Sequence, residues 1–215
     1  MNIERATGVV LRVRPLTETS LIVNWLTRDL GRVATVAKGA RRPKSPFRGQ
    51  IDLFYLAELA FARSRRSDLH TLREARLLES NPALRVELGF LRQASYCAAL
   101  IEQTTEAETP IPALFALFMG LLGQLPKQRT QPQAVFAFEM KLLEELGLKP
   151  NLAEANLTAG SRQILEKLTG MDWPAVFQVR PSAAQTTEIR LFLHGFLIYH
   201  LERIPRGRSK ALEAI

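Results

Sequence analysis

The chain has 215 residues, of which 47% are hydrophobic, and its formal net charge is +8. That length and apolar content suit one large or two small globular domains with a buried core. A single cysteine, Cys97, excludes an intramolecular disulfide and a four-cysteine zinc site. The first residues lack the pattern of a secretion signal, and no apolar run reaches the roughly 20 residues that cross a bilayer. We therefore expect a cytoplasmic protein without a membrane span, in which Cys97 is a buried, inert thiol.

The positive charge is concentrated in the first third of the chain. Residues 1–79 hold 15 Lys and Arg against 8 Asp and Glu, a net charge of +7, whereas residues 80–215 hold 14 against 13, a net charge of +1. Arginine dominates the basic part, and its planar guanidinium suits paired hydrogen bonds to phosphate. A phosphate backbone is therefore the expected partner of this part of the chain.

The same third of the chain has the pattern of a small β-barrel. Period-two and β-branched runs predict five strands. They span residues 7–14, 20–27, 32–37, 53–62 and 70–78. A loop over residues 38–49 separates the third strand from the fourth, since two prolines and two glycines there oppose regular structure. Five strands in so short a chain favour a five-stranded OB-fold over a sandwich, which needs about seven strands.

After residue 80 the apolar period becomes helical. The predicted long and medium helices span residues 83–106, 113–125, 133–146, 161–168 and 187–203, with Ser161 as the cap of the fourth. A short helix is also predicted at Pro174. The last is apolar on nearly every side, which predicts the central helix of a bundle, and the basic tail over residues 205–210 is expected to be exposed. The predicted fold is therefore α+β, with an OB-fold domain over residues 1–79 followed by a helical bundle domain over residues 80–215.

The loop over residues 38–49 is the leading candidate for a nucleic-acid site. Its cations are Lys38, Arg41, Arg42, Lys44 and Arg48, and it contains no acidic residue. We interpret it as a phosphate clamp, with a merely solvated loop as the alternative. Further nucleic-acid contacts are expected from cations of the strands, namely Arg14, Arg32, Arg73 and Arg76. Phe47, inside the loop, is the candidate for stacking on a base.

No group of residues resembles an active site or a metal site. His194 and His200 lie six residues apart, about 240° around a helix, so they cannot share a ligand. His200 follows the apolar line of its helix and is expected to be a core histidine. We therefore expect a protein that is not an enzyme and that uses no cofactor and no metal.

Several segments, taken in order, resemble the bacterial RecO family of recombination mediators. They are Gly8-Val9-Val10-Leu11-Arg12-Val13-Arg14-Pro15, Glu18-Thr19-Ser20-Leu21-Ile22-Val23, Gly31-Arg32-Val33, Val36-Ala37-Lys38-Gly39-Ala40-Arg41-Arg42 and Thr71-Leu72-Arg73-Glu74-Ala75. More loosely similar are Phe138-Glu139 to Leu146-Gly147 and Arg208-Ser209-Lys210. The resemblance implies an amino-terminal OB-fold and a carboxyl-terminal helical domain. Many members carry a four-cysteine zinc module after a motif like Leu146-Gly147-Leu148-Lys149-Pro150, and this chain has no cysteine there, so zinc is not carried over.

The resemblance also implies an activity and partners. The family binds single- and double-stranded DNA, anneals complementary strands, contacts the acidic C-terminal tail of single-stranded DNA-binding protein, and acts with RecR to load RecA during gap repair. A protein of this kind is cytoplasmic and associates with the nucleoid when active. An apolar pocket in the helical domain with a basic rim would suit such a tail, and Lys141, Arg203 or Arg206 could form the rim. Two alternatives remain open: an RNA-binding OB-fold protein, and a scaffold whose helical half recruits proteins.

Overall fold

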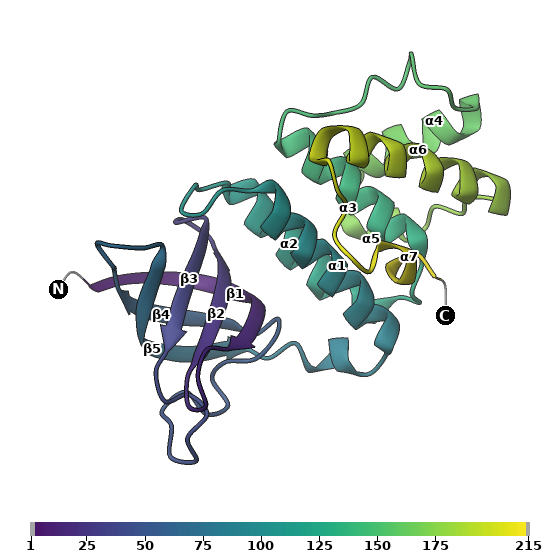
Figure 1. The fold of residues 1–215 in the computed structure, drawn as a ribbon. Coiled ribbons are helices and arrows are strands. Elements are labelled where there is room, and N and C mark those ends of the chain that lie inside the picture. Colours follow the sequence, from purple (N-terminus) through teal and green to yellow (C-terminus); the bar gives the residue numbers. More distant parts are fainter. Residues whose placement is uncertain (1–2, 214–215) are drawn as a thin grey trace. The chain divides into compact units, whose positions relative to one another are not determined.

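The computed structural model describes residues 3–213, which form a barrel unit and a helical unit (Figure 1). The barrel unit contains the residues up to Pro82 together with Thr104–Ala116. The helical unit contains Ala83–Gln103 and the chain from Leu117 onward. The sequence pattern assigns all of residues 80–215 to the helical domain, whereas the structure packs Thr104–Ala116 with the barrel.

Five strands close the barrel. They are β1 (Ile3–Pro15), β2 (Leu21–Thr27), β3 (Arg32–Ala37), β4 (Leu56–Ala62) and β5 (Leu69–Glu79). The order around the barrel is β1-β2-β3-β5-β4, with β1 also paired to β4. All neighbours are antiparallel except β3 and β5, which run parallel. This five-stranded closed arrangement, followed by helices, confirms the predicted OB-fold and the α+β fold class.

The fourth strand begins later than its alternating pattern suggests. Phe54 has a φ of 62° and is fully buried, so the chain turns there instead of extending. The Asn81 side chain donates a 2.7 Å hydrogen bond to the Phe54 carbonyl and supports this strained backbone. Regular pairing with β1 therefore starts at Leu56 and not at Leu53.

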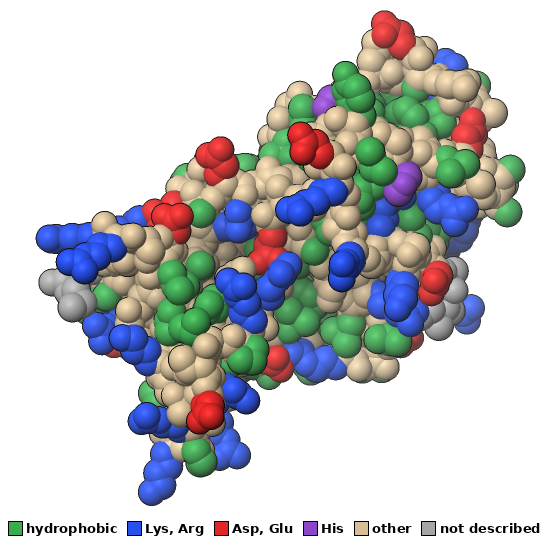
Figure 2. Space-filling view, in the orientation of Figure 1, with side chains coloured by type: hydrophobic (Ala, Val, Ile, Leu, Met, Phe, Trp, Pro, Cys, Tyr) green, Lys and Arg blue, Asp and Glu red, His purple; other side chains and the backbone are tan. Residues whose placement is uncertain are grey.

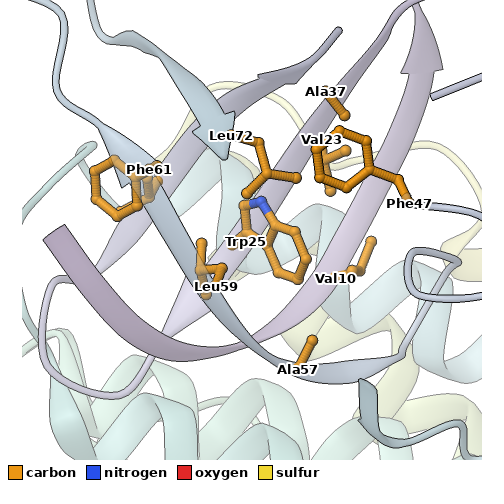
Figure 3. Close-up of a cluster of buried hydrophobic side chains, with 10 residues drawn as sticks. Val10, Val23, Trp25, Ala37, Phe47, Ala57, Leu59, Phe61 and Leu72 are labelled. Atoms are coloured by element: carbon orange, nitrogen blue, oxygen red, sulfur yellow. The ribbon is translucent and has the colours of Figure 1, made fainter. Parts of the chain in front are cut away.

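A compact apolar cluster fills the barrel (Figure 3). Trp25 and Phe61 are completely buried in it, and the Trp25 indole donates a 2.9 Å hydrogen bond to the Thr35 hydroxyl. Since the polar end of the large ring is satisfied, its burial carries no unpaired donor. Phe47, which comes from the long loop between β3 and β4, is also part of this cluster.

The helical unit is built from short and medium helices. The full order after the barrel is η1 (a 3-10 helix, Pro82–Arg85), α1 (Leu88–Thr104), α2 (Pro112–Gln124), η2 (a 3-10 helix, Leu125–Lys127), α3 (Pro132–Glu145), α4 (Ala159–Gly170), α5 (Trp173–Val176), α6 (Ala183–Leu201) and α7 (Arg208–Ala211). The single helix predicted over residues 83–106 is therefore two elements, because the chain makes only a 3-10 turn before α1 begins at Leu88.

The central helix of this unit is α3 and not α6. Every residue of α3 from Gln133 to Met140 is buried. In α6 only Ile189, Leu193 and Leu197 are buried, while Leu191 and Tyr199 are 63% and 83% exposed. The prediction from the apolar composition of α6 is therefore wrong, because only one of its faces packs against the unit.

Two helices begin earlier than their patterns predict. The cap of α4 is Thr158, whose side chain accepts a hydrogen bond from the Ser161 amide. Ser161 is thus the third residue of the helix and not its cap. Ser182 caps α6 and forms a capping box with Gln185, which adds a turn before the predicted start at residue 187.

The basic tail is not wholly exposed. Arg208 begins α7 and is only 6% exposed. Its guanidinium donates to both carboxylate oxygens of the fully buried Glu139, at 2.7 and 2.9 Å, and Tyr96 donates to the same carboxylate at 2.6 Å. The predicted exposure is wrong at this position, because a buried carboxylate within the unit requires a cation.

Among the described residues, no helix combines the length and the apolar content that a membrane crossing requires.

Candidate nucleic-acid interface

The basic loop between β3 and β4 is a series of consecutive turns. Each turn is closed by a backbone hydrogen bond of 3.0 to 3.2 Å, in which an amide donates to the carbonyl three residues earlier. The donor and acceptor pairs are Arg42 and Gly39, Ser45 and Arg42, Arg48 and Ser45, and Gln50 and Phe47. Gly39 and Gly49 adopt φ values of 70° and 73°, which favour glycine. The loop therefore has a defined backbone, from which its charged side chains extend outward.

Several contacts tie this loop to the barrel, and three of them lie along its length. The Arg41 amide donates to the Thr19 carbonyl at 3.0 Å, so the loop lies against the turn between β1 and β2. The Gln50 side chain accepts a 2.9 Å hydrogen bond from the Leu77 amide of β5. Phe47 inserts its ring into the core and is only 7% exposed (Figure 3). Nothing in the sequence pattern identifies Thr19 or Gln50 as anchors.

The burial of Phe47 corrects its predicted contact with a base. The ring enters the cluster on the side of Val23 and Ala37 (Figure 3), where a nucleic-acid base cannot reach it. Burial of an aromatic ring in a core is more favourable than its exposure to water, so a lone aromatic residue in a charged loop is more stable in the core. Phe47 holds the loop, and the cations around it form the surface.

All five loop cations are exposed: Lys38, Arg41, Arg42, Lys44 and Arg48. Within the described residues, none of them forms an ion pair with a carboxylate. The two hydrogen bonds made by their guanidinium groups go to the neutral carbonyls of Thr17 and Pro43, at 3.2 and 3.4 Å. Figure 2 shows Lys and Arg side chains gathered on this protruding loop at the lower left, with acidic atoms also visible beside them. The loop therefore keeps its full charge of +5 for an external anion.

Arg14 lies at the same end of the barrel as the loop. It is exposed near the end of β1, opposite Ile22, and leads into the turn that receives the Arg41 hydrogen bonds. Arg12 is exposed on the same side of the strand. The strand register thus extends the basic surface from the loop onto β1.

The other predicted cations of the strands have different surroundings. Arg76 pairs with Glu58 at 2.7 Å, and nearby Arg5 pairs with Glu74 at 3.3 Å. These two ion pairs line a depression of about 500 Å³ on the surface of β1, β4 and β5. Arg73 is exposed on β5 and has other interactions. This surface carries charges of both signs, so it attracts a polyanion less than the loop does.

Arg32 is not brought to the loop. It begins β3, whereas the loop follows the end of that strand. Its guanidinium donates to the Thr105 hydroxyl at 2.7 Å and to the Thr105 carbonyl at 2.5 Å. The predicted phosphate contact is replaced by a structural contact, because Arg32 fastens the segment after α1 to the barrel.

A cluster of charged residues fixes the same segment. The Glu108 carboxylate accepts hydrogen bonds from Arg63 and His70, and Arg63 also pairs with Glu4 at 2.7 Å. The His70 ring is 2% exposed, stacks on Phe61, and accepts the Ser64 amide at Nδ1, so Nε2 carries the proton that faces Glu108. These bonds offset the positive φ of Glu108, which is 58°.

This cluster predicts a loss of stability in acid. Hydrogen bonds from Arg63 lower the pKa of Glu4 below the ordinary 4.5. Burial raises the pKa of Glu108, but the hydrogen bonds from Arg63 and His70 outweigh this effect, so the pKa of Glu108 is also below 4.5. Their stabilisation is therefore present above pH 4.5 and is lost as the pH falls through the lower folded-state values. We expect Glu108→Gln to lower the free energy of unfolding by about 1–2 kcal/mol at neutral pH and to flatten its decline in acid. Urea denaturation at pH values on both sides of this window measures both effects.

The matched control is Glu106→Gln, which changes an exposed residue of the same segment. An unchanged acid dependence in the Glu108 variant, or an equal effect of both substitutions, would show that the cluster does not fix the segment.

The predicted basic rim of the helical unit is dispersed. Lys141 is half-buried and donates to the Thr169 and Met171 carbonyls at 2.7 and 2.6 Å, and burial lowers its pKa. It therefore satisfies the end of α4 and is not an open rim residue. Arg203 and Arg206 are exposed in the segment between α6 and α7.

A depression of about 400 Å³ adjoins that segment. It is lined by apolar Leu191, Ile204, Pro205 and Leu212, with Arg190 at its edge. His194 also lines it. His200 is exposed at the end of α6, where its ring lies beside those of Phe196 and Tyr199, so its predicted place in the core is wrong. Within residues 3–213, no three His, Cys, Asp or Glu side chains gather in a way that could hold a metal ion.

Comparison with known proteins identifies the family. A profile described as "Recombination protein O N terminal" matches residues 1–81, and one described as "Recombination protein O C terminal" matches residues 91–155. A DNA repair protein RecO from Cyanothece sp. is 34% identical over 216 residues, which cover 97% of this chain and 71% of that relative. The chain belongs to the RecO family.

Two further RecO relatives match over shorter spans. The DNA repair protein RecO of Bacillus subtilis is 34% identical over 67% of this chain, and that of Rhodopirellula baltica is 32% identical over 66%. The matches cover 56% and 53% of these relatives, so this chain spans little more than half of their length. The RecO profiles include the whole basic loop but stop before α4, so the depression beside α6 lies beyond them.

Proposed function

We propose that this chain acts in DNA recombination and repair by binding single- and double-stranded DNA through the loop surface, defined as Lys38, Arg41, Arg42, Lys44, Arg48 and Arg14. In this role it anneals complementary strands and helps to load RecA on DNA coated with single-stranded DNA-binding protein, together with a RecR-like partner. It is a binding protein and not an enzyme. The family membership and the chemistry of the barrel support this proposal.

The contrast between paired and unpaired cations carries the proposal. Arg5, Arg63 and Arg76 of the barrel each face a carboxylate within 3.3 Å. Within residues 3–213, none of the five loop cations has a carboxylate partner, and the guanidinium hydrogen bonds of Arg41 and Arg48 go to carbonyl groups. A paired guanidinium gains little from a phosphate because it must first give up its carboxylate, whereas an unpaired one gains the full contact and releases counterions from the DNA.

Annealing follows from the same charge. Two complementary strands repel each other through their phosphates, and a surface that neutralises several phosphates removes part of that repulsion. Base pairing then supplies the free energy, so no nucleotide needs to be hydrolysed. Because the loop holds charges and no exposed aromatic ring, phosphate contacts outweigh base contacts, and we expect low sequence specificity.

The test is the annealing of two complementary oligonucleotides coated with single-stranded DNA-binding protein, across a salt series. If about five phosphates are neutralised, the logarithm of the DNA affinity should fall with the logarithm of salt concentration with a slope of roughly −3.5 to −4.5. Acceleration that fades with salt supports the proposal. Absence of acceleration by the folded protein would contradict it.

Competition between matched DNA and RNA strands separates this function from the alternative of an RNA-binding OB-fold protein. An A-form or single-stranded RNA offers the same phosphates, so the loop alone does not choose between them. Stronger binding to RNA at equal length and sequence would favour the alternative.

The depression beside α6 favours a second contact, with the acidic tail of single-stranded DNA-binding protein. Leu191, Ile204 and Leu212 line it and suit an apolar side chain, and Arg190 with exposed Arg206 supplies positive charge near it. Fluorescence anisotropy of a labelled acidic peptide that ends in an aromatic residue tests this contact. Peptide binding that survives when DNA binding is lost would support a scaffold role of the helical unit.

A further inference from the structure

We propose that Phe47 is a positioning residue, which anchors the basic loop to the barrel core and so presents its cations to DNA in a preformed arrangement. The proposal rests on the proposed DNA-binding function and names the residue on which that surface depends. Phe47 itself touches no DNA.

The geometry of the loop supports this role. Between the end of β3 and the start of β4 lie residues 38–55, and Phe47 is the cluster member that comes from the middle of this span. Arg48 follows it directly, and Lys44 precedes it by three residues, so both cations are within one turn of the anchor. Hydrogen bonds to Thr17, Thr19 and Ser20 hold one side of the loop, and the bond to Gln50 holds the other. Ala40 and Ile51 pack against the cluster near the two sides of the loop, but they are only partly buried. Phe47 is the buried ring between these sides, and each hydrogen bond alone is one that water can replace.

A preformed loop binds DNA more tightly because it does not have to lose conformational entropy on binding. Fixing the backbone of a flexible residue on binding has an entropic cost, and a loop of cations that is already fixed does not incur it. Removing the Phe47 ring therefore leaves every charge in place but makes the loop mobile. Loss of the anchor should weaken DNA binding without changing the number of phosphates that the protein neutralises.

Phe47→Ala is expected to lower the affinity for a single-stranded oligonucleotide about tenfold, which corresponds to the ordering cost of one or two residues. The slope of affinity against salt should stay at the wild-type value, because the count of cations is unchanged. Removal of a charge instead flattens the slope. Fluorescence anisotropy over a salt series separates these two results.

Trypsin gives a second measurement that does not depend on DNA. The loop offers cleavable bonds after Lys38, Arg41, Lys44 and Arg48, whereas the bond after Arg42 precedes Pro43 and resists trypsin. Cleavage at these four bonds should be slow in the wild type and about tenfold faster in the Phe47→Ala protein, since a protease needs a mobile segment. Cleavage after the exposed Arg65 and Arg66 in the turn between β4 and β5 should not change.

Two further variants keep the test decisive. Leu59→Ala removes a buried side chain of the same core cluster on β4, and it should destabilise the barrel while leaving loop cleavage and DNA affinity at wild-type values. Phe47→Leu retains a smaller apolar anchor, so it should lose less affinity than Phe47→Ala but still bind measurably more weakly than the wild type. If Phe47→Ala does not fold, the test rests on Phe47→Leu, whose loop should be cleaved faster and whose DNA affinity should be lower than in the wild type.

Wild-type affinity and wild-type loop cleavage in a folded Phe47→Ala or Phe47→Leu protein would overturn the inference, as would equal losses in Leu59→Ala. If the wild type itself binds no DNA, the proposed function fails, while the trypsin measurement still decides whether Phe47 anchors the loop.

Discussion

Reversal of charge at Arg41 and Arg42 should weaken DNA binding by about 100-fold at low salt, because each change removes one charge-assisted hydrogen bond of about 1.5 kcal/mol or more to a phosphate. Two carboxylates in the centre of the loop surface add repulsion. The salt dependence should become shallower by roughly two units of slope, since two fewer phosphates are neutralised. Arg41→Glu/Arg42→Glu should also abolish acceleration of annealing while leaving the melting temperature near that of the wild type, because both side chains are exposed.

A matched control has the same change of net charge elsewhere on the barrel. Arg65 and Arg66 are adjacent, exposed arginines in the turn between β4 and β5, at the opposite end of β4 from the loop (Figure 1). Arg65→Glu/Arg66→Glu should reduce affinity only slightly, through the long-range field. If both double variants lose affinity equally, the loop is not the binding surface and net charge alone drives the interaction. Binding measured by anisotropy on the same oligonucleotide compares the two directly.

The sequence predicted the barrel well because its strands face a single core. Period-two burial is a local property, and the strand β3, from Arg32 to Ala37, alternates between partly exposed and buried residues as its pattern requires. The loop was also evident, since proline and glycine exclude regular structure locally. Its exposed cations could be named from charge alone, and the structure places Arg14 near them.

The errors came from long-range contacts. Arg32 and Arg76 have the same residue type as the loop cations, and only the tertiary structure brings Thr105 and Glu58 to them. Phe47 could have been recognised as an anchor, since a lone aromatic residue within a charged loop is more stable in a core than in water. No local signal could show that α6 packs on one face only, because its composition is apolar on every side.

The helical unit depends on a buried ion pair, and Arg208→Ala should lower its free energy of unfolding by about 3–5 kcal/mol. The carboxylate of Glu139 is fully buried on α3, and after the substitution its one remaining hydrogen-bond partner among the described residues is the Tyr96 hydroxyl. It also removes the 3.2 Å hydrogen bond from Arg208 to the Arg190 carbonyl, which ties α7 to α6. Urea denaturation followed by circular dichroism measures the loss.

Two comparisons isolate the unpaired charge as the cause. Arg206→Ala removes an exposed arginine from the same segment and should change the free energy of unfolding by less than about 0.5 kcal/mol. Arg208→Met/Glu139→Leu removes both charges, and it should be more stable than Arg208→Ala because no buried carboxylate remains uncompensated. A double variant as unstable as the single one would mean that packing of the Arg208 side chain, and not its charge, holds α7 in place. The loop surface is in the other unit, so the DNA affinity of folded Arg208→Ala should equal that of the wild type.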